Sequence, residues 1–164
     1  MSVPRTSTIG EKPLVVVVDD QATGRAVLGR LIREIDQDIR VVSFTDAASA
    51  LEFVRRDTPD LIITDYLMPE MDGISLIRRV RSTLSCNDIP IIVVTVSEDK
   101  RVRYEALDAG ATDFLTRPVD PLECRARCRN LLTQHQQYKI IRDRSRWLER
   151  RVAEATSEIR LRER

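Results

Sequence analysis

The sequence predicts an α/β fold in which five parallel strands form one sheet with helices on both faces. Short apolar runs alternate with segments of helical spacing along about a hundred residues. Each parallel strand needs a crossover before the next, and a helix usually supplies it, so the alternation favours a doubly wound arrangement. The apolar runs are rich in β-branched residues and lack polar alternation, which is typical of strands buried on both faces.

The expected elements follow one another without long gaps. Gly110 stands where a helix should end, and Pro121 suits the first turn of the helix that it opens. The pair Asp72-Gly73 is typical of a turn that leads into a helix. The predicted strands are 14–18, 41–44, 61–64, 91–94 and 114–116, and the predicted helices are 22–35, 47–56, 74–83, 100–109 and a long one from residue 121.

Composition limits the classes of partner and location. The 164 residues carry a net charge of +1, with 42% hydrophobic and 32% charged residues. Such a balance provides no global field for nucleic acid or an anionic membrane, so neither partner is expected. No apolar run approaches the ~18 residues of a membrane span, and residues 1–12 lack the apolar core of a secretory signal. We therefore expect a cytoplasmic protein whose first twelve residues form a disordered lead.

Acidic side chains gather at the predicted strand ends. Asp19 and Asp20 follow the first strand and Asp65 follows the third, while Thr95 and Arg117 follow the fourth and fifth. The carboxyl ends of parallel strands share one edge of a sheet, where ligands of such folds bind. Converging carboxylates repel one another unless a hard cation neutralises them, so the cluster predicts Mg²⁺.

The same strand ends indicate phosphoryl chemistry. A carboxylate can attack phosphorus and form an aspartyl phosphate, while the hydroxyl of Thr95 and the cation of Arg117 stabilise the oxygens. No histidine, cysteine or serine stands at a strand end, which argues against protease, esterase and hydride-transfer sites. A glycine-rich phosphate loop is also missing from the sequence.

The ordered motifs resemble the receiver domains of two-component response regulators, which have a flavodoxin-like fold. The resemblance covers about 14–132. The matching pieces are Val-Val-Asp19-Asp20, Asp65-Tyr-Leu-Met-Pro69-Glu-Met-Asp72-Gly73, Thr95 and Arg117-Pro118. It implies that Asp65 accepts a phosphoryl group from a sensor histidine kinase or a phosphotransfer protein.

The resemblance also assigns roles to the other site residues. It implies that Asp20, Asp65 and the backbone carbonyl of Leu67 hold Mg²⁺ while Asp19 assists. Thr95 and Phe114 would form the switch pair, in which the hydroxyl moves to a phosphoryl oxygen and the aromatic ring turns into the vacated space. The catalytic set implied is Asp65, Thr95 and Arg117.

Two residues depart from the family pattern. The family usually has lysine where this chain has Arg117, and a planar guanidinium replaces a compact ammonium. Val96 stands where the family often has a smaller residue, which narrows access to the site. We expect a working phosphoryl acceptor, and the alternative is a degenerate receiver that serves as a constitutive dimerisation scaffold.

Beyond the receiver, one long helix is expected, because 122–164 contain neither glycine nor proline. Seven of ten positions in two series of sevenfold spacing are apolar, which predicts a parallel coiled coil and hence a homodimer. The alternatives are a surface helix that packs on its own domain and an arginine-rich tail that binds nucleic acid. The two series are Leu131, Tyr138, Ser145, Val152, Ile159 and Gln134, Ile141, Leu148, Ala155, Arg162.

The resulting domain plan is a lead at 1–12, a receiver domain at 13–132 and a helical linker at 133–164. The run from Arg146 to Glu163 resembles the linkers that join receivers to HD-GYP cyclic-di-GMP phosphodiesterase domains. We therefore expect an output domain beyond the linker, with diguanylate cyclase, histidine kinase, phosphatase or no output as alternatives. Any output enzyme would lie outside this chain.

Overall fold

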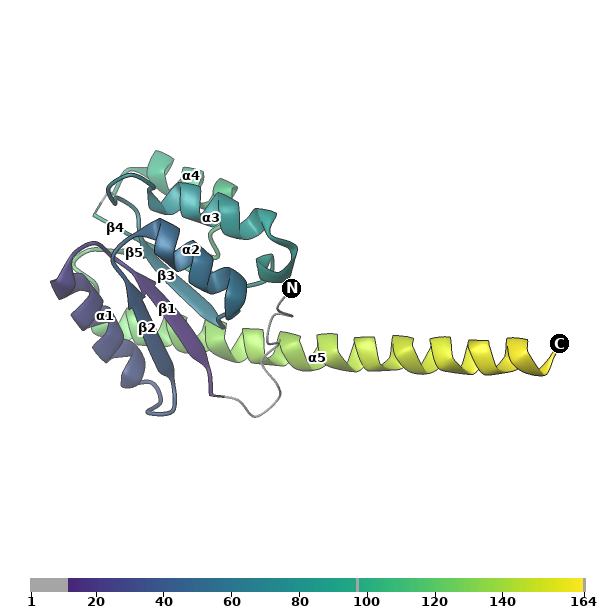
Figure 1. The fold of residues 1–164 in the computed structure, drawn as a ribbon. Helices are drawn as coiled ribbons and strands as arrows, with labels where there is room; N and C mark the ends of the chain where they lie inside the picture. Colours follow the sequence, from purple (N-terminus) through teal and green to yellow (C-terminus); the bar gives the residue numbers. More distant parts are fainter. Residues whose placement is uncertain (1–11, 97, 164) are drawn as a thin grey trace.

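The computed structural model describes residues 12–96 and 98–163, so the predicted lead lies outside the described residues except for Lys12. Five parallel strands form one sheet in the order β2-β1-β3-β4-β5 (Figure 1). The predicted sheet is therefore confirmed, and each predicted strand end lies within one residue of the observed one. The strands are β1 (Leu14–Val18), β2 (Arg40–Phe44), β3 (Leu61–Asp65), β4 (Ile91–Thr95) and β5 (Asp113–Thr116).

The helices cover both faces of the sheet. One apolar core lies between the sheet and α2, α3 and α4, and a second lies between the sheet and α1 and α5. Successive β1 residues enter opposite cores, because side chains alternate along a strand. The helices are α1 (Ala22–Arg33), α2 (Ala47–Arg56), α3 (Gly73–Ser82), α4 (Lys100–Ala109) and α5 (Pro121–Arg162), with a short 3-10 turn η1 (Leu84–Cys86) that the sequence did not indicate.

Local capping explains where these helices begin and end. The Asp72 carboxylate accepts the backbone N–H of Ser75 at 2.8 Å and so caps α3. Gly110 has φ of 114° and ends α4 in the left-handed conformation, where a side chain would be strained. Pro121 lies in the first turn of α5, where its missing N–H is not needed. All three predicted boundary signals are thus confirmed.

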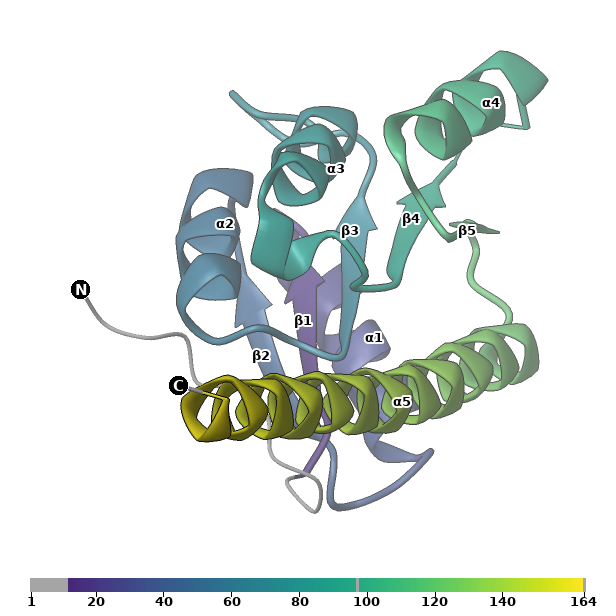
Figure 2. The same ribbon diagram turned by 90° about the vertical axis from the view of Figure 1, so that its right-hand side faces the viewer.

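Helix α5 continues for 42 residues without a break. Its first turns bury Cys124, Cys128 and Leu132 in the core that it shares with α1. It then passes the amino ends of the strands and extends beyond the sandwich (Figures 1 and 2). Every residue from 144 to 163 is exposed, so no other part of the described chain buries this end of the helix.

A buried ionic group fastens α5 to the amino end of the sheet. Asp60, which is 2% exposed, accepts the backbone N–H of Leu14 at 2.8 Å and the ammonium of Lys139 at 2.6 Å. His135 Nε2 lies 3.7 Å from the same carboxylate. As far as this contact, α5 packs on its own domain, as the surface-helix alternative predicted. The exposed part that follows stays available to a partner. No helix in the described ranges is long and apolar enough to cross a membrane.

Candidate functional site

The predicted acidic residues meet at the carboxyl end of the sheet. Asp19 and Asp20 directly follow β1, and Asp65 is the last residue of β3, the strand beside it. One carboxylate oxygen from each lies within 4.8 Å of the others. Asp19 is fully buried, Asp65 is partly buried and Asp20 is exposed, so the group opens toward solvent on one side. The predicted cluster is present in the structure.

The loop after β3 is held close to the site by backbone contacts. The N–H of Tyr66 donates to the carbonyl of Val94, and the N–H of Gly73 donates to the carbonyl of Tyr66 at 3.0 Å. A Cβ at position 73 would lie 3.2 Å from the carbonyl carbon of Asp65 and would overlap its oxygen. Gly73 is thus required by close approach and not by an unusual backbone angle.

Arg117 forms the basic side of the site. Its Nη2 donates to Oδ2 of Asp19 at 2.6 Å and lies 3.8 Å from Oδ2 of Asp65. Its backbone N–H donates to the carbonyl of Thr95 at 2.8 Å, and its peptide bond with Pro118 is cis. The buried Nε of Arg117 has no hydrogen-bond partner among the described residues. A buried donor of this kind costs free energy unless a ligand satisfies it.

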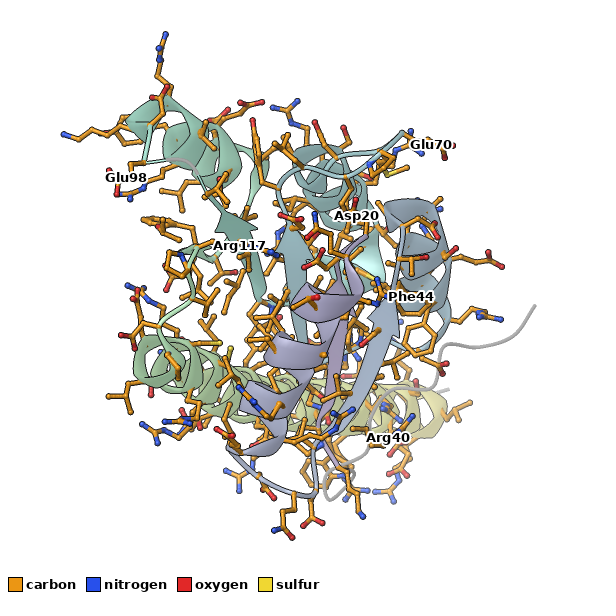
Figure 3. All side chains as sticks on the ribbon, turned by 90° about the vertical axis from the view of Figure 1, so that its left-hand side faces the viewer. Asp20, Arg40, Phe44, Glu70, Glu98 and Arg117 are labelled. Atoms are coloured by element: carbon orange, nitrogen blue, oxygen red, sulfur yellow. The ribbon has the colours of Figure 1, made fainter. Side chains whose placement is uncertain are left out.

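A cavity of about 270 Å³ opens above these groups. Figure 3 shows Asp20 and Arg117 at this end of the sheet, while Arg40 lies at the opposite end. The predicted residues Leu67 and Thr95 reach the cavity, and the exposed side chain of Val96 stands at its edge. The cavity is lined by Asp20, Gln21, Asp65, Tyr66, Leu67, Thr95, Val96 and Arg117.

The predicted switch residue Phe114 does not line the cavity. It lies on β5 beside Val93 and is partly buried. The guanidinium of Arg103, on α4, covers its ring with 4.7 Å between Cζ and the ring centroid. A cation over an aromatic face is attracted to it, so α4 and β5 are joined at this point.

Burial raises the pKa of Asp65, Arg117 acts in the opposite direction, and the carboxylate of Asp19 adds to the rise. The charged form of Asp65 is thus disfavoured in the folded protein without a cation. This is the environment expected of a group whose charge is meant to be neutralised by a ligand.

We expect Asp65→Asn to raise the free energy of unfolding near pH 7 by about 1 kcal/mol in the absence of Mg²⁺. A carboxyl whose pKa rises on folding favours the folded state below its ordinary value of 3.8, and this contribution is lost as pH rises through the folded pKa. The variant should therefore gain most above that pKa and little near pH 4. Urea unfolding across this range measures the difference, and a less stable variant near pH 7 would contradict it.

Sequence reasoning missed three residues around Asp19. The backbone N–H of Gln21 donates to Asp19 Oδ1 at 2.9 Å, and Arg25 Nη1 donates to the Asp19 carbonyl at 2.8 Å. Gly24 lies against the same carboxylate. Only Gly24 carried a readable signal, because glycine inside a helix is unfavourable unless packing requires it.

The architecture and the acidic cavity define a known class of signalling domain. The family model of the response regulator receiver domain matches residues 15–129, which is more than half of the 164-residue chain. The chain therefore belongs to the response regulator receiver domain family.

Individual relatives narrow the comparison. The chain is 41% identical over 150 residues to the cyclic di-GMP phosphodiesterase response regulator RpfG of Xanthomonas campestris, covering 92% of this chain and 40% of that protein. It is 33% identical over 133 residues to the response regulator PleD of Caulobacter vibrioides, covering 80% of this chain and 28% of that protein. The chain thus spans less than half the length of either relative.

Solved structures agree with the fold. The signal receiver domain of an HD domain-containing protein from Pseudomonas fluorescens superposes with a TM-score of 0.68 and 25% identity. The match covers 84% of this chain and 98% of that one. The similarity therefore extends past the residues matched by the family model.

Proposed function

We propose that this receiver accepts a phosphoryl group on Asp65 from a sensor histidine kinase or a phosphotransfer protein in the cytoplasm. The observation that carries the proposal is the convergence of three carboxylates, a hydroxyl and a guanidinium at the carboxyl end of one sheet. A carboxylate oxygen of Asp65 forms a bond to phosphorus while the phosphorus–nitrogen bond of a phosphohistidine breaks. The imidazole leaves with the bonding electron pair and takes up a proton.

The donor set fits Mg²⁺, which favours carboxylate and carbonyl oxygens together with water and phosphate. Oxygens of Asp20, Asp65 and the Leu67 carbonyl would hold the ion, and Asp19 would orient the group. Bound Mg²⁺ would neutralise the carboxylates and draw charge from the phosphoryl oxygens. Thr95 and Arg117 would donate hydrogen bonds to those oxygens.

The phosphoryl group would be sensed by Thr95 and Phe114. When the hydroxyl of Thr95 turns to a phosphoryl oxygen, the ring of Phe114 can move toward the space that it leaves. That movement would end the contact between Phe114 and Arg103, because the ring would leave the face of the guanidinium. A local charge would thereby change the surface of α4.

The exposed part of α5 would carry the signal to a dimer partner and to an output domain. Five apolar and exposed residues lie in the two series of sevenfold spacing: Tyr138, Val152 and Ile159 in one, and Ile141 and Leu148 in the other. Such a stripe pairs best with its own copy in a parallel coiled coil. The similarity to RpfG, named a cyclic di-GMP phosphodiesterase response regulator, supports an output of the HD-GYP class.

One observation favours the alternative, a degenerate receiver that acts as a dimerisation scaffold. Arg117 already pairs with the fully buried Asp19 at 2.6 Å, so both groups have partners before any phosphoryl group arrives. In this case the long helix would be the main functional element, and the acidic cavity would be without activity.

Intact-mass measurement after incubation with acetyl phosphate and Mg²⁺ separates the two functions. We expect a metal-dependent phosphoryl adduct in the wild type and in Arg117→Lys, and complete loss of the adduct in Asp65→Asn. Loss should be complete because, among the described residues, no other carboxylate combines partial burial with contact to Arg117. An unmodified wild type together with a modified Arg117→Lys would establish the degenerate receiver instead.

A further inference from the structure

Gly24 occupies an unusual place for a glycine, the first turn of α1. Glycine disfavours a helix relative to alanine because it loses more backbone freedom on folding. Its backbone is not in the left-handed region, since Gly110 is the one glycine with positive φ among the described residues. Conformational freedom therefore does not explain Gly24.

Space explains it. A Cβ at position 24 would lie 2.8 Å from Cγ of Asp19 and would overlap Oδ2, and it would approach Nη1 of Arg117 to 3.4 Å. Asp19 has little room to retreat, because it is fully buried and its Oδ1 accepts the N–H of Gln21 at 2.9 Å. Any side chain larger than hydrogen at position 24 must displace this carboxylate.

The same oxygen that meets Gly24 also meets the guanidinium. Oδ2 of Asp19 accepts Nη2 of Arg117 at 2.6 Å, so this oxygen lies between Arg117 and the backbone of α1. A guanidinium is planar and larger than an ammonium, so it can adjust less when its partner moves. The position of Arg117 therefore depends on free space at residue 24.

We infer that Gly24 is a positioning residue that allows arginine, in place of lysine, to serve the acceptor site. It does so by leaving room for the carboxylate of Asp19 to pair with Arg117 beside Asp65. The inference rests on the proposed phosphoryl acceptance at Asp65, because the paired groups are those expected to orient Mg²⁺ and the phosphoryl oxygens.

A double-mutant cycle of Gly24→Ala and Arg117→Lys tests this dependence. With Arg117 present, Gly24→Ala should slow adduct formation from acetyl phosphate about tenfold, because small misplacements of reacting groups are costly. The variant should also unfold at a lower temperature and bind Mg²⁺ more weakly. With lysine at position 117, Gly24→Ala should alter the adduct rate and the Mg²⁺ affinity less than about twofold, since the ammonium can follow Asp19. It should also lower the unfolding temperature less than it does with arginine.

Gly29→Ala provides the matched control in the same helix. The nearest atoms to a Cβ there would be the flexible end of Arg33, at 3.3 Å, and a methyl group of Val41, at 3.9 Å. This variant should keep the wild-type adduct rate and unfold at an equal or higher temperature, because alanine favours a helix.

The results of the cycle distinguish a failure of the inference on Gly24 from a failure of the proposed phosphoryl acceptance. Equal effects of Gly24→Ala with arginine and with lysine at position 117, or no effect with arginine, would overturn the inference. A wild type that forms no adduct would instead overturn the proposed function. In that case the unfolding temperatures of the four proteins still decide whether Gly24 and Arg117 depend on each other, because they require no phosphoryl transfer.

Discussion

Replacing Asp60 with alanine is expected to lower the free energy of unfolding by about 3 kcal/mol. The carboxylate is buried and accepts both the N–H of Leu14 and the ammonium of Lys139. Its removal leaves a buried backbone donor without a partner and a largely buried cation, 16% exposed, without a counter-charge. Urea unfolding followed by circular dichroism measures the loss.

The pair Asp60 and Lys139 supplies its own control. Burial lowers the pKa of His135, although Asp60 acts in the opposite direction, so the imidazole is uncharged near pH 7 and Lys139 provides the cation. Lys139→Met should therefore destabilise the wild type but should recover stability in the Asp60→Ala background. Additive losses would contradict a direct pairing of the two charges.

Asp60→Ala should also loosen α5 from the receiver. Asp60 directly precedes β3, and its partners His135 and Lys139 lie in α5; Lys139 is 79 residues further along the chain. Amide hydrogen exchange of the helix at 133–142 should accelerate in Asp60→Ala, while exchange of β1 and β3 follows only the global loss. Unchanged relative protection of that segment would show that the contact does not fasten the helix.

Local patterns predicted the sheet well because each strand is specified by its own residues. The run Leu14–Val18 is apolar and β-branched along its length, and all five residues are buried, as a strand covered on both faces requires. The acidic cluster was predictable for a related reason, since parallel strands bring their carboxyl ends together. These predictions need the order of elements and no knowledge of distant contacts.

The contacts that local patterns could not predict join residues far apart in the sequence. Asp60 directly precedes β3, and nothing in the residues around it indicates that its side chain binds Lys139. The partner of Arg117 was also unpredictable, because several acids stand at the strand ends and the sequence does not indicate which of them pairs with it. The predicted coiled coil and the domain boundary at 132 stay predictions, since each depends on a partner or a segment beyond the described residues.

Replacing Leu148 with glutamate is expected to weaken dimerisation about 100-fold, a loss of about 2.7 kcal/mol. Leu148 is 56% exposed and lies at the centre of the apolar stripe, seven residues after Ile141. In a parallel pair its two copies would face each other, so the substitution removes buried apolar area and brings two like charges together. Sedimentation equilibrium over a range of concentrations measures the dissociation constant.

The matched control is Trp147→Glu. Trp147 is equally exposed, at 59%, and precedes Leu148 directly, but its position lies outside both series of sevenfold spacing. Its ring contacts Arg151 of the same helix, 5.8 Å from the centroid, so its loss costs a contact within the chain and not one across the seam. Equal weakening by the two substitutions would point to nonspecific association of exposed apolar residues. A selective effect of Leu148→Glu would show that two copies of α5 pair through the residues of the sevenfold series. Both helices of the pair would then run in the same direction, away from the receiver domains whose signal they carry.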